Sequence, residues 1–162
     1  MAVSTATPEP TESEWHVYNT VCARRVHAET LLWQVPILSL TAQAFLFSVA
    51  LAPGSSSLAR YASAGLSVAV TYLSVTLLAR NRQSEITDAE WLEEFEKELE
   101  PNLRQHGHAW LERRDRYRPH GIARVIPLVN AFGTWAVGLV VFGIAALGVL
   151  VVTAVAPEWF QS

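Results

Sequence analysis

Histidine is the residue type in this chain best suited to chemistry, and three histidines lie between residues 106 and 120. His106 and His108 flank Gly107, and His120 follows a short way on. Since histidine is a common metal ligand, such a group could form the metal site of a membrane-associated enzyme. Residues two apart on a helix do not face each other, however, and the glycine favours a turn. We therefore expect no catalytic residue, cofactor or metal, and keep the metal-dependent enzyme as the last alternative.

A second set of polar side chains lies inside long apolar stretches. In lipid, small hydroxyl and amide residues let helices approach closely and hydrogen-bond across the contact. The set comprises Gln34, Thr41, Gln43, Ser48, Ser63, Ser67, Thr71 and Ser74. We expect this stripe either to pack helices together or, in an oligomer, to face a hydrated pore. Gln43 lies near the middle of its stretch, and its amide should find a hydrogen-bond partner.

A third set lies on a strongly acidic helix that we expect to begin at a capping box of Thr87 and Glu90. Apolar residues line one side of this helix, and the rest, which includes Asp88, Glu93 and Glu96, is acidic. The face that could dock a partner protein consists of Trp91, Phe95, Leu99, Glu90, Glu94 and Glu98.

An arginine-rich segment follows Pro101, and its cations lie just before the last apolar stretch. Anionic lipid headgroups attract such cations, so we expect lipid contacts from Arg113, Arg114, Arg116 and Arg118. The acidic and basic helices are predicted to pair, with the aromatic side chains packed on Trp110. Nucleic-acid binding is not expected, because the chain has a net charge of −3 and the arginines lie beside phospholipid.

The side chains described above lie within or next to three uncharged runs: residues 30–59, 61–79 and 125–157, the last of them 33 residues long. About 20 apolar residues suffice to cross a bilayer as a helix. No ionisable residue lies inside a span, which argues against pumps, antiporters and intramembrane proteases. The sequence thus predicts an all-α integral membrane protein with three transmembrane helices and amphipathic cytosolic helices.

Local signals divide the chain further. A capping box of Thr11 and Glu14 should begin an amphipathic helix, and Pro53 with Gly54 should turn the chain between two spans. The predicted parts are a disordered tail (1–10), an N-terminal helix (11–30), a two-span hairpin (31–79), a cytosolic segment (80–127), a third transmembrane helix (128–156) and an outer tail (157–162).

Lysine and arginine predict the orientation. Arg24 and Arg25 precede the first span and nine cations lie between residues 80 and 127, whereas the hairpin has Arg60 alone and the final tail none. Basic residues are retained in the cytoplasm, so the N-terminus and central loop should be cytosolic and the C-terminus outside. We expect the bacterial inner (plasma) membrane.

The chain also resembles two groups of known proteins. The segments Arg24-Arg25-Val-His-Ala-Glu29, Leu-Leu-Trp33-Gln34-Val-Pro36 and Thr41-Ala-Gln43-Ala-Phe-Leu-Phe47 resemble a family of uncharacterised small membrane proteins from GC-rich bacteria, over residues 12–100. In architecture alone, the hairpin and the following helix are similar to SLATT-type two-span effectors of bacterial conflict systems, which are predicted to form pores. The chain differs from those effectors by its third span and by the lack of a sensor domain, and neither resemblance implies catalytic residues.

These observations predict a non-enzymatic membrane protein. We expect a structural or regulatory membrane subunit that acts in the lipid bilayer through helix association, as a homo-oligomer or with a partner membrane or cytosolic protein. An oligomeric pore-forming effector is the alternative.

Overall fold

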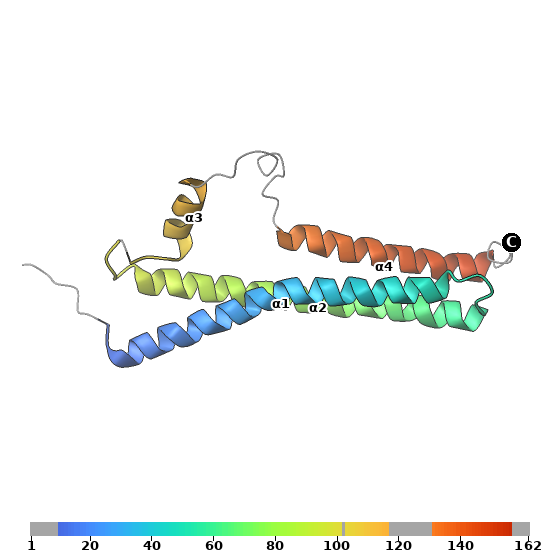
Figure 1. Cartoon of the computed structure of the whole chain (residues 1–162), viewed down its shortest axis with the longest axis horizontal. Coiled ribbons are helices and arrows are strands. Elements are labelled where there is room, and N and C mark those ends of the chain that lie inside the picture. The colour runs from blue at the N-terminus through green and yellow to red at the C-terminus, as the bar shows by residue number, and fades with distance from the viewer. Residues whose placement is uncertain (1–9, 102, 117–130, 157–162) are drawn as a thin grey trace, which may run out of the picture. The chain divides into compact units, whose positions relative to one another are not determined.

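A computed structural model describes residues 10–101, 103–116 and 131–156, without the side chains of residues 114, 115 and 131 (Figure 1). The described part of the chain is all-helical: α1 (Glu12–Ala50), α2 (Ser57–Glu96), α3 (Gly107–Arg116) and α4 (Ala131–Val155). Three of these helices, α1, α2 and α4, are long and apolar enough to cross a membrane. The predicted all-α fold with three candidate spans is therefore confirmed. The predicted tails lie outside the described residues, apart from Pro10.

The chain divides into two units, which we describe separately. The polar unit consists of Met1–Glu29 and Gln83–Pro127, and the apolar unit of Thr30–Arg82 and Leu128–Ser162. Both α1 and α2 run from one unit into the other without interruption. The N-terminal helix and the first predicted span are thus a single helix.

The capping box predicted at the start of α1 is confirmed. The Thr11 amide donates a hydrogen bond to Oε2 of Glu14 at 2.6 Å, and the Glu14 amide donates to Oγ1 of Thr11 at 3.4 Å. These bonds satisfy amides that have no partner within the first turn of a helix. The helix then continues through the buried Pro36 to Ala50.

The turn between α1 and α2 is where Pro53 and Gly54 predicted it. Gly54 has a φ of 77°, a conformation that glycine adopts without steric cost. Ser56 caps α2, since its Oγ accepts a hydrogen bond from the Ala59 amide at 3.2 Å. Arg60 is buried, and its Nε donates to the Ala50 carbonyl oxygen at 3.3 Å. The one cation of the hairpin therefore stabilises the C-terminal end of α1.

The second predicted capping box is wrong, because α2 does not begin again at Thr87. That residue lies inside α2, and its hydroxyl donates to the Gln83 carbonyl oxygen at 3.0 Å, one turn earlier. No proline or glycine lies between Ala79 and Glu96, so a helix already formed in the span propagates through this region at little cost. The second span and the acidic helix are one element of 40 residues.

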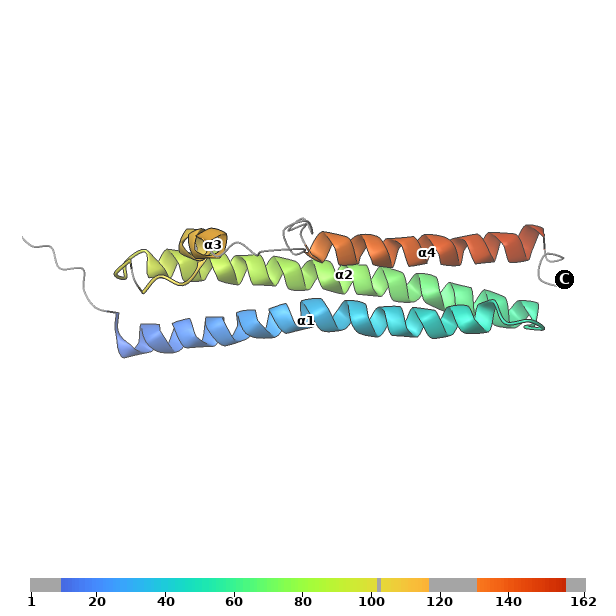
Figure 2. The same ribbon diagram turned by 45° about the horizontal axis from the view of Figure 1, so that its top comes forward.

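In the apolar unit, the second half of α1, the first half of α2 and α4 run side by side (Figure 2). Between 22% and 28% of the most apolar window of each helix is buried, so most of these side chains face outward. An outward apolar surface of this extent suits lipid as the solvent.

Candidate functional site

The polar unit contains a cluster of aromatic side chains that joins the start of α1 to the end of α2. The ring of Phe95 lies 5.7 Å from that of Trp15 and 5.1 Å from that of Tyr18, and Trp91 stacks on Phe95 at 5.6 Å. We expected these side chains to pack on Trp110 of the basic helix. The structure instead places Phe95 against α1 and leaves Trp110 51% exposed.

Glu96 is the centre of a buried hydrogen-bond network. Its Oε1 accepts from the Tyr18 hydroxyl at 2.7 Å and lies 2.6 Å from Nδ1 of His106. Its Oε2 accepts from the amides of Gln105 and His106 at 2.6 and 2.8 Å. Burial alone would raise the pKa of Glu96, but these hydrogen bonds lower it below its ordinary value. A charged carboxylate therefore holds the loop before α3 against the end of α2.

Glu93 binds the first residues of α3 in a similar way. Its Oε1 accepts from the His108 amide at 3.3 Å and lies 2.7 Å from Nδ1 of His108. These contacts lower the pKa of Glu93 and raise that of His108. Gly107 has a φ of 58°, and a Cβ there would come within 2.0 Å of the Glu93 carboxyl carbon, so only glycine permits this approach.

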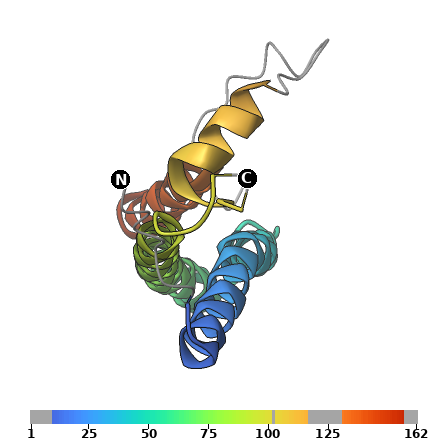
Figure 3. The ribbon, with the colours of Figure 1, turned by 90° about the vertical axis from the view of Figure 1, so that its left-hand side faces the viewer.

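Two arginines complete the attachment of α3, which lies beside the end of α2 (Figure 3). Arg104 donates to the carbonyl oxygens of Lys97 and Leu99 at 2.8 and 3.1 Å and so caps α2. Arg113 donates to Oε1 of Gln105 at 2.6 Å. The acidic and basic helices thus meet at the N-terminal end of α3, where Glu93 and Glu96 accept hydrogen bonds from backbone amides.

Of the arginines expected to contact lipid headgroups, the structure describes the side chains of two. Arg113 is half-buried in the contacts above, and Arg116 is exposed. The side chains of Arg114 and Arg118 lie outside the described residues. The expected lipid contact of this segment stays a prediction.

The two arginines that predict the orientation also form ion pairs in the polar unit. Arg24 forms a two-pronged hydrogen bond with Asp88, whose side chain is almost fully buried. Arg25 lies 3.7 Å from Glu85. A buried carboxylate needs such a partner, since an unpaired charge away from water is costly.

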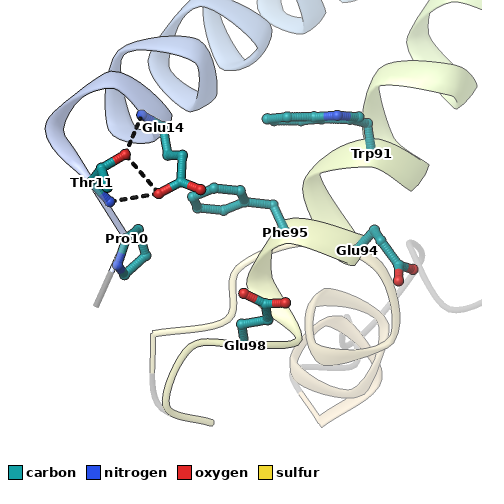
Figure 4. A pocket seen from close by; sticks show the side chains of 7 residues that line it. All are labelled: Pro10, Thr11, Glu14, Trp91, Glu94, Phe95 and Glu98. Carbon is teal, nitrogen blue, oxygen red and sulfur yellow. Dashed lines mark hydrogen bonds between the residues drawn. The ribbon is translucent and has the colours of Figure 1, made fainter. Parts of the chain in front are cut away.

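A pocket of about 490 Å³ opens between the start of α1 and the end of α2 (Figure 4). Its lining residues are Pro10, Thr11, Glu14, Trp91, Glu94, Phe95 and Glu98. Four of the six residues predicted for partner docking line it: Trp91, Glu94, Phe95 and Glu98. Of the other two, Glu90 is exposed outside the pocket and Leu99 is half-buried outside it. The structure therefore concentrates the predicted docking face into a defined concave site.

The polar stripe of the apolar unit mostly faces inward. Ser63, Ser67 and Ser74 are buried and Thr71 is half-buried on α2, and Gln43 is buried on α1. The predicted partner of Gln43 exists, because its Nε2 donates to Oγ1 of Thr71 at 2.9 Å. Oε1 of Gln43 and Oγ of Ser67 are buried and have no hydrogen-bond partner among the described residues.

The remaining stripe residues, Gln34, Thr41 and Ser48, are exposed on α1. The hydroxyls of Thr41 and Ser48 donate to carbonyl oxygens of their own helix at 2.9 Å. Their polar groups are thus satisfied without a partner helix, so exposure to lipid costs little.

Thr71 is the point where the three apolar helices meet. It bonds Gln43 of α1 and donates to its own helix at the Ser67 carbonyl oxygen at 3.0 Å. On the α4 side, a Cβ at Gly143 would lie 2.7 Å from Cγ2 of Thr71. The four glycines of α4 wind around that helix and specify no single contact by their spacing, but the structure uses Gly143 for close packing.

Two of the four histidines that the structure describes bind carboxylates. His106 and His108 bind different carboxylates, and no three histidine, cysteine, aspartate or glutamate side chains converge as a metal site within it. His120 lies outside the described residues. Burial raises the pKa of the Cys22 thiol, which disfavours the nucleophilic thiolate.

Sequence reasoning missed the inward role of Asp88 and Glu96, which were assigned to the acidic side of their helix. Both lie four residues from Leu92, which is fully buried, so all three share one face of α2. That spacing was a usable signal. Nothing local to the sequence indicated that Gly107 must admit the Glu93 carboxyl group.

Comparison with known proteins finds no matching protein-family model, no matching curated protein and no matching solved structure.

Proposed function

We propose that this chain is a non-enzymatic structural or regulatory subunit of the bacterial inner membrane, which holds a partner protein at the cytosolic surface. The pocket lined by Trp91, Phe95 and three glutamates carries the proposal. It lies on helices that continue into candidate spans, so an occupant would be tied directly to the membrane anchor.

The contacts within the polar unit support this proposal. Aromatic packing, the Glu96 network and the Arg24–Asp88 pair all hold the walls of the pocket in place. Preorganised surfaces bind partners with less entropic cost than surfaces that must order on binding. The alternative, an oligomeric pore, receives less support, because the buried stripe residues of α2 serve packing within one chain.

Site-specific photo-crosslinking in cells tests the proposal. A photoreactive residue at position 98 should form one reproducible adduct with another protein, whereas the same residue at position 90 should not. With the photoreactive residue kept at position 98, the adduct should disappear in a variant with Glu94→Lys, which reverses another charge of the pocket.

The matched control carries Glu90→Lys. It changes the net charge equally, at an exposed position that does not line the pocket. Equal loss of the adduct in both variants, or its absence from position 98 in the otherwise unchanged chain, would refute docking at this site.

A further inference from the structure

The pocket on the polar unit combines an aromatic wall with a rim of one charge. Trp91 is 39% exposed and lies parallel to Phe95, with an angle of 20° between the rings. Figure 4 shows the carboxylates of Glu14, Glu94 and Glu98 around these two rings. The volume of about 490 Å³ is within the usual range for a ligand site.

The electrostatics of this pocket favour a cation. None of its lining residues is basic, and hydrogen bonds from Thr11 lower the pKa of Glu14, which keeps that carboxylate charged. Within the described residues Glu98 forms no ion pair, and Glu94 pairs only with the exposed Lys97 at 2.5 Å. An exposed pair of this kind is weak and readily exchanged.

The aromatic wall selects among cations. The face of an indole ring attracts a guanidinium or ammonium group, because the ring carries partial negative charge on its face. A small hydrated metal ion gains little from such a wall, and anionic lipid headgroups are repelled by the three carboxylates. Arginine is well suited, because its planar group both stacks on rings and binds carboxylates with two hydrogen bonds.

We propose that this pocket binds an arginine side chain from a basic segment of the partner protein, an inference that rests on the proposed docking function. The guanidinium stacks on Trp91 and donates to Glu98 and Glu94. The rest of the segment lies along the rim toward Glu14.

Peptide binding to the purified full chain in zwitterionic nanodiscs tests this inference. The probe is a capped, fluorescent peptide with two arginines separated by glycine and serine, and the control peptide has citrulline in place of each arginine. Citrulline keeps the size and removes the charge. We expect saturable binding at least about tenfold tighter for the arginine peptide, as a difference of roughly 1.4 kcal/mol implies.

Variants locate the site. Trp91→Leu, and separately the pair Glu94→Gln and Glu98→Gln, should each weaken binding about fivefold or more, as loss of a cation–π contact or of charge-assisted bonds implies. The pair Glu90→Gln and Glu100→Gln, at exposed positions outside the pocket, should leave binding unchanged. The glutamine variants alter exposed side chains only, so they remain informative even if Trp91→Leu fails to fold.

Three results would overturn the inference: equal binding of both peptides, equal loss in the pocket and control variants, or peptide binding that arises only after Arg113 and Arg116 are neutralised. The last result would mean that the chain's own arginines occupy the pocket. If the adduct at position 98 persists in cells while the peptide test fails, docking stands and arginine recognition does not. If the unchanged pocket gives no adduct at position 98 while the peptide still binds, docking of a partner protein is refuted instead.

Discussion

At the scale of single residues, two carboxylates do most to shape the polar unit. Glu96 accepts hydrogen bonds from α1, from the loop before α3 and from a histidine, while Glu93 accepts from the first residues of α3. Both lie near the C-terminal end of α2, where negative charge is unfavourable by itself. The donors from α3 offset this, because a helix N-terminus favours an anion.

The pair of Glu93 and His108 predicts a pH dependence. The pKa of Glu93 is lowered from 4.5, so its contribution to stability is present above pH 4.5 and lost as the pH falls through its folded pKa. The pKa of His108 is raised from 6.5, mainly by Glu93 and also by Glu112, while Lys97 opposes this rise. The contribution of His108 to stability is therefore present below pH 6.5 and lost as the pH rises through its folded pKa.

Attachment of α3 should therefore be strongest between about pH 4.5 and 6.5. Hydrogen exchange of residues 105–110, corrected for the intrinsic effect of pH, should show less protection at pH 8 than at pH 5.5. His108→Ala should abolish the difference, and His16→Ala, an exposed change on α1, should retain it. A difference that survives in His108→Ala would assign the effect to another group.

At the scale of elements, the ends of α1 and α2 each have a separate chemical cause. Thr11 and Glu14 begin α1, Arg60 and Gly54 end it, Ser56 begins α2 and Arg104 ends it. The absence of glycine or proline between Ala79 and Glu96 lets α2 pass from an apolar to an acidic sequence without a break. Local chemistry, not the change in solvent, sets the helix limits.

The contact of Gly143 with Thr71 predicts how α4 responds to small substitutions. Gly143→Ala should force α4 away from α2, at a cost of about 1–3 kcal/mol, and lower the melting temperature measured in mild detergent. Alanine at Gly138 or Gly148 meets nothing within 4 Å and should be neutral or stabilising, because alanine favours a helix.

A second substitution, on the other side of the contact, tests the same prediction. Thr71→Ser removes the methyl group that a Cβ at Gly143 would approach but keeps the hydroxyl for Gln43. It should therefore recover much of the stability lost in Gly143→Ala. Equal effects of alanine at all three glycines, or no recovery, would contradict the close contact.

At the scale of the whole molecule, nine of the twelve cations lie in the polar unit. Arg24, Arg25 and the cations after residue 82 belong to the polar unit, while the apolar unit has Arg60, Arg80 and Arg82 near the ends of its helical segments. This distribution is typical of a protein whose polar unit stays in the cytoplasm.

Reporter fusions test the orientation. Alkaline phosphatase fused after Ser162 should be active, and a fluorescent protein at the same position should not fluoresce. A reporter inserted in the loop after Glu96 should behave in the opposite way. A cytosolic C-terminus would contradict three crossings, since an odd number must place the two ends on opposite sides of the membrane.

Sequence alone determined the features that depend on near neighbours or on the length of apolar runs. It predicted the three candidate spans, the capping box at Thr11, the turn at Gly54 and a partner for Gln43, because each follows from a local pattern or from the cost of an unsatisfied polar group. It also predicted four of the seven residues that line the pocket. The prediction was wrong at Thr87, because a helix that is already formed continues through the local capping signal there.

The tertiary structure decided which polar groups face each other. Their spacing from Leu92 places Asp88 and Glu96 on the buried face of α2, but only the structure shows that Arg24 faces Asp88 and that Tyr18 and His106 face Glu96. In the same way, one glycine of four in α4 contacts Thr71. Such pairings join residues that are far apart in the chain. A buried carboxylate or a glycine in a helix contact is stabilising only if its partner lies opposite it, and a single sequence does not show which residues lie opposite each other.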